Sequence, residues 1–367
     1  MFLRSHLVLT SLLLFSLPLV ATEPSQRISG PFSQSNLTVF LLHGKDTLSG
    51  DSKLMTLDEA LEKKKLIVHE TSNVNLLAVE NISDDVEVFV QSGDIVKGGR
   101  QDRLIACDMI VPHKSGKVPI SSFCCENGRW KQRGSESAAE FGVSNAQAAN
   151  QALKLAVNSS RDQAEVWARV REAQKKLAMN VGKPVANATS PSSYQLTLED
   201  KEVLTKVDNY TTDLKKLVED NADAIGFVIV INGKVEGAEL YGSHSLFLKL
   251  WPKLIFGAAV DALSELDAKK TFKLPTEKDI EVFLVDASKG KEKEIVASAA
   301  TNQQMLAPTS GAQPRPNSNI AGTGTSKTDA GKPSRVVVVS TENDKTVLLE
   351  ARDRKDNSIV HRSYIAK

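Results

Sequence analysis

Alternation of apolar and polar residues dominates the chain between residues 39 and 125. Segments of this kind are typical of strands with one buried face, and the clusters of Asn, Asp, Ser and Gly between them are typical of turns. The sequence therefore predicts a mainly antiparallel β region. We expect its strands at Val39–Leu42, Leu66–Glu70, Val74–Glu80, Val86–Val90, Leu104–Val111 and Val118–Phe123.

A single helix is expected within this β region. Thr56-Leu57-Asp58-Glu59 has the form of a capping box. In such a box the threonine side chain accepts a hydrogen bond from the amide of the fourth residue, and the glutamate reaches back to the first. The sequence therefore predicts a helix that opens at Thr56 and runs to about Lys64.

Helical spacing replaces the strand pattern after residue 143. Apolar residues recur every three or four positions from Val166 to Ala173, and Trp167 lies in phase with them, so we interpret Trp167 as a core residue. Ser144-x-x-Gln147 and Ser160-x-x-Gln163 have capping-box form and predict two helix starts. Further helices are expected at Thr197–Asn221, Ser245–Leu266 (bent by Pro252) and Thr276–Ala287.

Strands return at two later places. Asn232-Gly233 separates the apolar runs Ile225–Ile231 and Val235–Tyr241, and this dipeptide is the strongest short-range signal for a hairpin. The terminal strands, which we expect to join a sheet formed earlier, are Arg335–Val339, Val347–Arg352 and Ile359–Ile365. The predicted fold class is α+β, with an antiparallel β-rich N-terminal half packed against a helical and hairpin C-terminal half.

The first 21 residues have the pattern of a secretory signal. Arg4 supplies a positive charge, Leu7–Val20 an apolar run, and Ala21 a small residue at the cleavage point. A membrane anchor is the alternative, but the run is short for a span and Pro18 interrupts it. We expect a cleaved signal, no stable membrane span afterwards, and an exported protein in the periplasm or outside the cell.

Composition marks a second segment as different from its surroundings. Residues 289–333 are rich in Pro, Ser, Thr, Asn and Gly and have few large apolar side chains, which predicts a low-complexity linker or loop. The expected organisation is a signal at 1–21, an α+β domain at 30–288, the linker at 289–333, and terminal strands at 334–367.

Charge and cysteine content exclude some functional classes. The chain has 46 basic and 45 acidic residues, which argues against a dedicated nucleic-acid-binding protein. Three cysteines are too few for a disulfide scaffold. Cys107 pairs with Cys124 or Cys125, or the thiols are free and buried; the sequence leaves these alternatives open.

The segment Gln91–Arg103, QSGDIVKGGRQDR, is the densest polar stretch of the β region. Glycine permits close approach by another group, and arginine can bind phosphate or carboxylate through two parallel hydrogen bonds. In the alternative interpretation, Asp94 and Asp102 pair with the arginines in a buried structural network. The candidate ligand-binding residues of this segment are Lys97, Gly98, Gly99, Arg100, Gln101 and Arg103.

Arg103 separates these two interpretations. It stands at the start of the apolar strand Leu104–Val111, in phase with Ile105 and Cys107, whereas Leu104 and Ala106 point to the other face. We hypothesise that Arg103 faces a cleft at the rim of the core.

A second polar cluster, Cys125-Glu126-Asn127-Gly128-Arg129-Trp130, closes the region. Glu126 is a candidate general acid or base, together with Asp94, if the carboxyl group is partly desolvated. Arg129 and Trp130 are candidate ligand-binding residues, because a tryptophan ring can stack on a base or a sugar. An ion pair capped by a core tryptophan is the alternative.

Searches for established catalytic motifs give negative results. Ala321–Thr328 superficially resembles a phosphate-binding loop but lacks its glycines and precedes no expected helix. His43, His69 and His113 are too scattered to indicate a metal site. No complete catalytic triad can be argued from the sequence, and we assign no cofactor, no metal and no oligomeric state.

Four of these motifs together resemble one uncharacterised bacterial family. They are TLDEAL, a strand that ends in Glu70, SGDIVKGGRQDR and CCENGRW. The family is the domain named for its association with ADP-ribosylglycohydrolases and rhodanese-phosphatase proteins (ARPP), and the resemblance covers most of residues 35–288. It implies a contextual link to ADP-ribose-like metabolites and no assigned reaction.

The sequence thus supports two functional hypotheses. In the first, an exported domain binds a small anionic or nucleotide-derived ligand between residues 94–103 and 126–130, with arginines as charge stabilisers. In the second, the domain is a non-catalytic structural or protein-interaction module, and the same residues only hold its sheets together.

Overall fold

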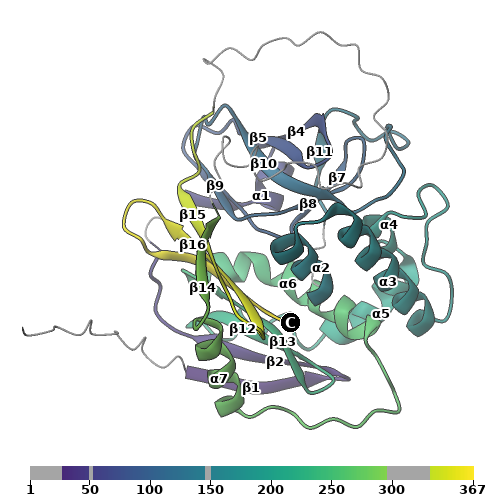
Figure 1. Cartoon of the computed structure of the whole chain (residues 1–367), viewed down its shortest axis with the longest axis vertical. Helices are drawn as coiled ribbons and strands as arrows, with labels where there is room; N and C mark the ends of the chain where they lie inside the picture. The colour runs from purple at the N-terminus through teal and green to yellow at the C-terminus, as the bar shows by residue number, and fades with distance from the viewer. Residues whose placement is uncertain (1–26, 49–52, 145–149, 296–330) are drawn as a thin grey trace, which may run out of the picture.

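The computed structural model describes residues 27–48, 53–144, 150–295 and 331–367, and it has the predicted α+β class (Figure 1). Its β-strands form sheets of eight, six and three strands. The predicted signal at 1–21, most of the predicted linker 289–333 and the loop-like segment 321–328 lie outside the described residues.

Three separate parts of the chain build the eight-stranded antiparallel sheet. The order is β1-β2-β12-β13-β17-β16-β15-β14, so N-terminal, central and C-terminal strands lie side by side. Asn232 and Gly233 both have positive φ and close the predicted hairpin. The strands are β1 (Arg27–Gln34), β2 (Leu37–His43), β12 (Ala224–Ile231), β13 (Lys234–Tyr241), β14 (Lys291–Ile295), β15 (Val336–Glu342), β16 (Thr346–Asp353) and β17 (Ile359–Ala366).

Helices cover both faces of this sheet. Apolar side chains of α6 pack with one face of β2 and β12, α3 packs on α6, and α7 packs with the opposite face of the sheet (Figure 1). Every residue of β2 and β12 is therefore buried, as expected for strands covered on both sides. The later helices are α2 (Gln151–Leu155), α3 (Gln163–Val181), α4 (Tyr194–Leu198), α5 (Lys201–Thr211), α6 (His244–Ser264) and α7 (Glu277–Ala287).

The β-rich region between residues 54 and 142 forms an N-terminal lobe. A six-stranded sheet, β11-β7-β8-β10-β5-β4, and a three-stranded sheet, β3-β6-β9, enclose a separate apolar cluster with α1 (Leu57–Glu62). Thr56 and Glu59 form the predicted capping box of α1. The strands are β3 (Leu54–Thr56), β4 (Leu66–Asn73), β5 (Leu76–Asn81), β6 (Glu87–Val90), β7 (Ile95–Gly98), β8 (Arg103–Ile105), β9 (Met109–Val111), β10 (Lys117–Cys124) and β11 (Phe141–Gly142).

The predicted strand Leu104–Val111 is two strands in the structure. β8 pairs with β7 and β10 in the six-stranded sheet, whereas β9 pairs with β6 in the three-stranded sheet. The apolar alternation continues across the break: Leu104 and Ala106 join one core cluster, and Ile105 and Cys107 join another. A continuous pattern thus concealed a change of partner strand.

Several predicted helix boundaries are wrong. Asp162 caps α3 in place of Ser160, and Asn150 caps α2, whereas the start predicted at Ser144-x-x-Gln147 runs into residues outside the described ranges. The expected helix Thr197–Asn221 is two helices, because Asp200 caps α5 within it, and α5 ends at Thr211. Short polar side chains compete as caps, so the residue that caps depends on the path of the chain before the helix.

The predicted linker 289–333 begins with structure, since β14 pairs along β15 at the edge of the eight-stranded sheet. The terminal strands enter that sheet as expected, with β17 beside β13. β1 had no counterpart in the sequence analysis. Its polar sequence, RISGPFSQ, lacks the apolar alternation that identified the other strands.

Candidate functional site

Arg103 is fully buried, so the hypothesis that it faces a cleft is wrong. Its Nη2 atom lies 3.2 Å from Oε2 of Glu70 on β4, and Nη1 donates to the carbonyl of Gln101 at 2.8 Å. The partner carboxylate is that of Glu70, and neither Asp94 nor Asp102 takes this place. Arg103 thus fastens the start of β8 to β4 inside the sheet.

Arg129 and Glu126 form a second buried pair, with Nε of Arg129 at 2.7 Å from Oε1 of Glu126. Glu126 also accepts hydrogen bonds from the backbone amide of Asp102, at 3.0 Å, and from the hydroxyl of Ser190. Burial by itself raises the pKa of Glu126, but the hydrogen bonds from Arg129 and Ser190 outweigh it and hold the pKa below the usual range. Glu126 is therefore a carboxylate whose oxygens are already occupied by donors.

Asp102 binds an arginine that the sequence analysis missed. Arg133 Nη1 and Nη2 lie 2.8 and 2.9 Å from the two oxygens of Asp102, in a two-point ion pair, and Ser193 donates to Oδ2 at 2.8 Å. Both Asp102 and Arg133 are buried. We call Glu70, Asp102, Arg103, Glu126, Arg129 and Arg133 the ionic network; its three cations balance its three anions.

The two glycines serve this network and its packing. Gly98 has a φ of +117° and donates its amide to Asp102 at 3.0 Å, while the carbonyls of Gly98 and Gly99 accept from Arg129. A Cβ on Gly99 would lie 2.2 Å from the ring of Phe141. The space that a glycine leaves open at this position is thus filled by a core aromatic ring.

Arg100 and Trp130 lie at the partly exposed rim of the ionic network. The guanidinium of Arg100 is 5.5 Å from the centre of the Trp130 ring, within the range of a cation–π interaction, and that of Arg103 is 5.6 Å from it. Within the described residues, the Arg100 guanidinium has no hydrogen bond or ion pair. Arg100 is therefore a cation without a partner carboxylate in the part of the chain that the structure describes.

The remaining predicted residues have partners within the protein. Gln101 is buried between the carbonyl of Glu126 and the thiol of Cys124. Lys97 is half-buried and binds both oxygens of Glu199 at 2.7 and 2.8 Å. Lys97 is thus available to a ligand only if it leaves Glu199.

Asp94 belongs to a different cluster from Glu126. Its Oδ1 lies 2.7 Å from Nζ of Lys253 on α6, and its Oδ2 accepts the amide of Gln91 at 2.9 Å. Lys253 also binds Asp58 at 2.7 Å, and burial, which lowers its pKa, is outweighed by the two carboxylates, which raise it to about 12. Asp94 therefore connects the N-terminal lobe to α6 as a paired carboxylate.

Sequence reasoning missed two of the six residues of the ionic network. Glu70 was known only as the end of a strand, and Arg133 lies in an irregular segment without a periodic pattern. Ser193 carried a detectable signal, because it is the N-cap of α4 and a serine before Tyr194–Leu198 is a usual cap. The pairing across β4, β8 and the loop after β10 is a tertiary feature.

The three cysteines are buried free thiols. Burial raises the pKa of Cys107 and of Cys124 to about 11. At neutral pH these thiols are protonated, so they are poor nucleophiles. The structure thus contains neither of the disulfides that the sequence left open.

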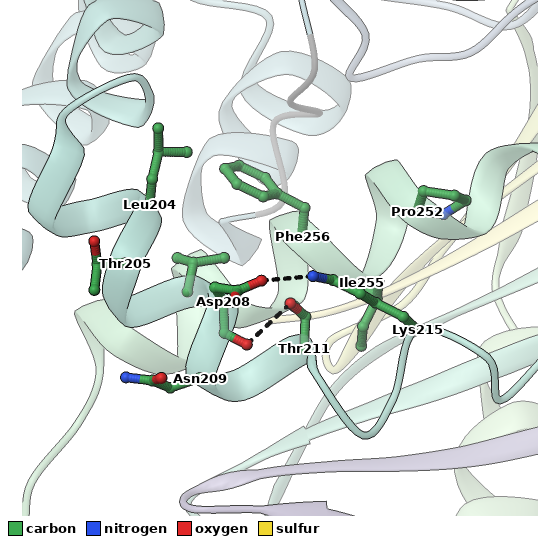
Figure 2. A pocket seen from close by; sticks show the side chains of 10 residues that line it. Leu204, Thr205, Asp208, Asn209, Thr211, Lys215, Pro252, Ile255 and Phe256 are labelled. Carbon is green, nitrogen blue, oxygen red and sulfur yellow. Dashed lines mark hydrogen bonds and ion pairs between the residues drawn. The ribbon is translucent and has the colours of Figure 1, made fainter.

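A cavity of about 660 Å³ lies between α5 and α6, away from the predicted residues (Figure 2). Its volume is in the range of small-molecule sites. In its wall, Lys215 Nζ lies 2.5 Å from Oδ1 of Asp208. The charge of this lysine is therefore already balanced by a carboxylate. It is lined by Leu204, Thr205, Val207, Asp208, Asn209, Thr211, Lys215, Pro252, Ile255 and Phe256.

Over the described ranges, no group of three or more His, Cys, Asp and Glu side chains is arranged to hold a metal ion. In the same ranges no helix is both long and apolar enough to span a membrane.

Comparison with known proteins supports the resemblance seen in the sequence. The family model described as the ARG and Rhodanese-Phosphatase-superfamily-associated Protein domain (ARPP-1) matches residues 25–321. This range contains the whole ionic network together with Arg100 and Trp130. No curated protein and no solved structure matches the chain.

Proposed function

The chain belongs to the ARG and Rhodanese-Phosphatase-superfamily-associated Protein domain family, and we propose that it is an exported protein that binds a small anionic ligand at Arg100 and Trp130. The observation that carries this proposal is the Arg100 guanidinium, which is held over an aromatic ring and has no carboxylate partner among the described residues. The pattern of residues 1–21 supports export.

The ionic network supports this role by keeping the rim rigid. The amide of Arg100 donates to Oε2 of Glu70 at 3.2 Å, and the same carboxylate oxygen binds Arg103. The backbone of Arg100 is thus fixed, while its side chain remains partly exposed. A pre-positioned guanidinium loses less conformational entropy when it binds an anion, which favours affinity.

The family name supports a ligand derived from ADP-ribose. Such a ligand combines phosphates, which arginine binds through two hydrogen bonds, with an adenine ring, which tryptophan can stack against. Phosphate recognition requires Arg100, and base recognition requires Trp130. The two contributions are therefore separable by substitution.

Calorimetric titration of the purified protein with ADP-ribose, AMP and inorganic phosphate tests the proposal. Arg100→Ala should weaken binding about 10-fold, the value of one charge-assisted hydrogen bond. Arg171→Ala, which removes an exposed arginine on α3, should leave affinity unchanged. If the unaltered protein binds none of the three, or if both variants bind equally well, the proposal fails.

The second candidate function is a non-catalytic structural or protein-interaction module. The specific observation in its favour is the charge balance of the ionic network, in which each buried cation already faces a carboxylate. An unaltered protein that shows no binding to any of the three anions would favour this candidate.

A further inference from the structure

Ser29, His43 and Asp223 lie in the relative arrangement of a serine hydrolase triad. Oγ of Ser29 is 2.7 Å from Nε2 of His43, and Nδ1 of His43 is 2.8 Å from Oδ1 of Asp223. These are the two hydrogen bonds that link nucleophile, base and orienting carboxylate. None of the three belongs to the ionic network or to the proposed ligand contacts.

Sheet register brings the three residues together. Arg27 is opposite His43 and Ser29 is opposite Leu41, so Ser29 and His43 are diagonal neighbours on one face of β1 and β2. Ala224, the first residue of β12, is opposite His43 on the other side of β2. Asp223 immediately precedes Ala224 and therefore reaches the histidine ring.

The three side chains differ in their exposure to solvent. The His43 side chain is 2% exposed, whereas Asp223 is 58% exposed and Ser29 is half-buried on β1. β1 is the edge strand of the eight-stranded sheet, so Ser29 lies at a sheet margin that a small substrate can approach. The base is thus shielded from solvent, and the nucleophile lies on the edge strand and is half-buried.

Arg27 keeps Asp223 ionised and decides how the imidazole is oriented. Its Nη2 atom is 2.6 Å from Oδ2 of Asp223, and hydrogen bonds from Arg27 and then His43 lower the pKa of Asp223 to about 2. The same Nη2 atom is 2.7 Å from Nδ1 of His43. Oδ1 of Asp223 can only accept a hydrogen bond, so its contact with Nδ1 at 2.8 Å assigns a proton to Nδ1, and Arg27 donates to Oδ2 of the same carboxylate. Nε2 is then free to accept the proton of Ser29.

We propose that Ser29, His43 and Asp223 form a hydrolytic site for small carboxylic esters. Oγ of Ser29 attacks the ester carbonyl carbon while its proton moves to Nε2 of His43. The bond between that carbon and the alcohol oxygen breaks, and His43 returns the proton to the alcohol. Water then attacks the acyl-serine, again giving a proton to His43, and the carboxylic acid leaves as Ser29 regains its proton.

An ester suits this site better than an amide. The alcohol needs only the single proton that His43 carries, whereas an amine is a much poorer leaving group. Asp223 does not exchange protons in this sequence and acts by orienting the ring.

A fluorophosphonate probe tests the proposal, because it reacts covalently with activated serines. The full chain should be labelled, and mass spectrometry should locate the label on Ser29. Ser29→Ala should abolish labelling and lower kcat/KM for p-nitrophenyl acetate about 1000-fold. Ser33→Ala is the matched control, since Ser33 lies on the same strand and its hydroxyl contacts Thr38 at 2.9 Å. This control should keep full labelling and activity.

Asp223→Asn provides a second test that does not depend on a buried position. The side chain is largely exposed, so the variant should keep its melting temperature. Labelling at Ser29 should slow by about 10-fold or more, because the histidine loses the carboxylate that fixes its tautomer. An unlabelled native protein, a label on another serine, or equal labelling of Ser29→Ala and the native protein would each overturn the proposal.

Discussion

Replacing Arg103 by alanine should lower the free energy of unfolding by about 3–5 kcal/mol, because it leaves the buried carboxylate of Glu70 without its cation. The side chains of Arg103 and Glu70 are 0% and 3% exposed, so water cannot compensate for the lost charge. The variant also loses the donor to the Gln101 carbonyl. Urea unfolding followed by circular dichroism measures this effect.

The double variant Arg103→Met with Glu70→Gln separates the pair from the packing. It removes both charges, so it should be more stable than Arg103→Ala alone, since no uncompensated charge remains. Arg171→Ala serves as the surface control and should change stability by less than about 0.5 kcal/mol. A near-native stability of Arg103→Ala would show that Glu70 has another source of compensation and would contradict the buried network.

Stability should fall as the pH rises from about 6.5 to 9, because of His361. This residue is buried on β17, with Nδ1 at 2.7 Å from Asp108 and Nε2 at 2.9 Å from Glu239. Burial lowers the pKa of His361, but the two carboxylates outweigh it and raise the pKa to about 9 from 6.5. The folded state therefore binds the proton over a pH range in which the unfolded state has released it. Below pH 6.5 the protonation of His361 contributes about 3 kcal/mol to the free energy of unfolding. This contribution is lost as the pH rises from 6.5 through 9.

Urea unfolding of the native chain and of His361→Gln at several pH values between 6 and 9 measures this loss. The variant should be less stable at pH 6 and should lack most of the slope. His113→Gln, which changes an exposed histidine, should keep it. A native protein whose stability is constant over this range would contradict the raised pKa. On the acid side, Glu239, whose pKa is lowered to about 2, retains its contribution down to about pH 4.5.

Local sequence patterns predicted the secondary structure more accurately than they predicted the surroundings of the polar residues. Alternation correctly separated Leu104 and Ala106 from Ile105 and Cys107, because the two faces of a strand need no tertiary information. The same alternation placed Arg103 at the rim of the core, but it did not reveal that Arg103 forms an ion pair with Glu70. That contact depends on how β4 and β8 are arranged in the sheet, which local periodicity does not encode.

The Ser29–His43–Asp223 triad shows the same limit. The residues are separated by 14 and 180 positions, and only the register of β1, β2 and β12 brings them together. β1 itself escaped detection, since its sequence has little apolar alternation. Isolated serines and histidines carry no spacing signal unless they share one helix or one turn.

The arrangement of the eight-stranded sheet has a consequence for biosynthesis. β17 lies between β13 and β16, so the last residues of the chain pair directly with a hairpin formed near its middle. Until β17 has emerged from the ribosome, β13 has an open edge and the sheet is incomplete. Long-range pairing of this kind slows folding, so this sheet can be completed only at the end of synthesis, whereas the N-terminal lobe has its own core and needs no C-terminal strand within its sheets.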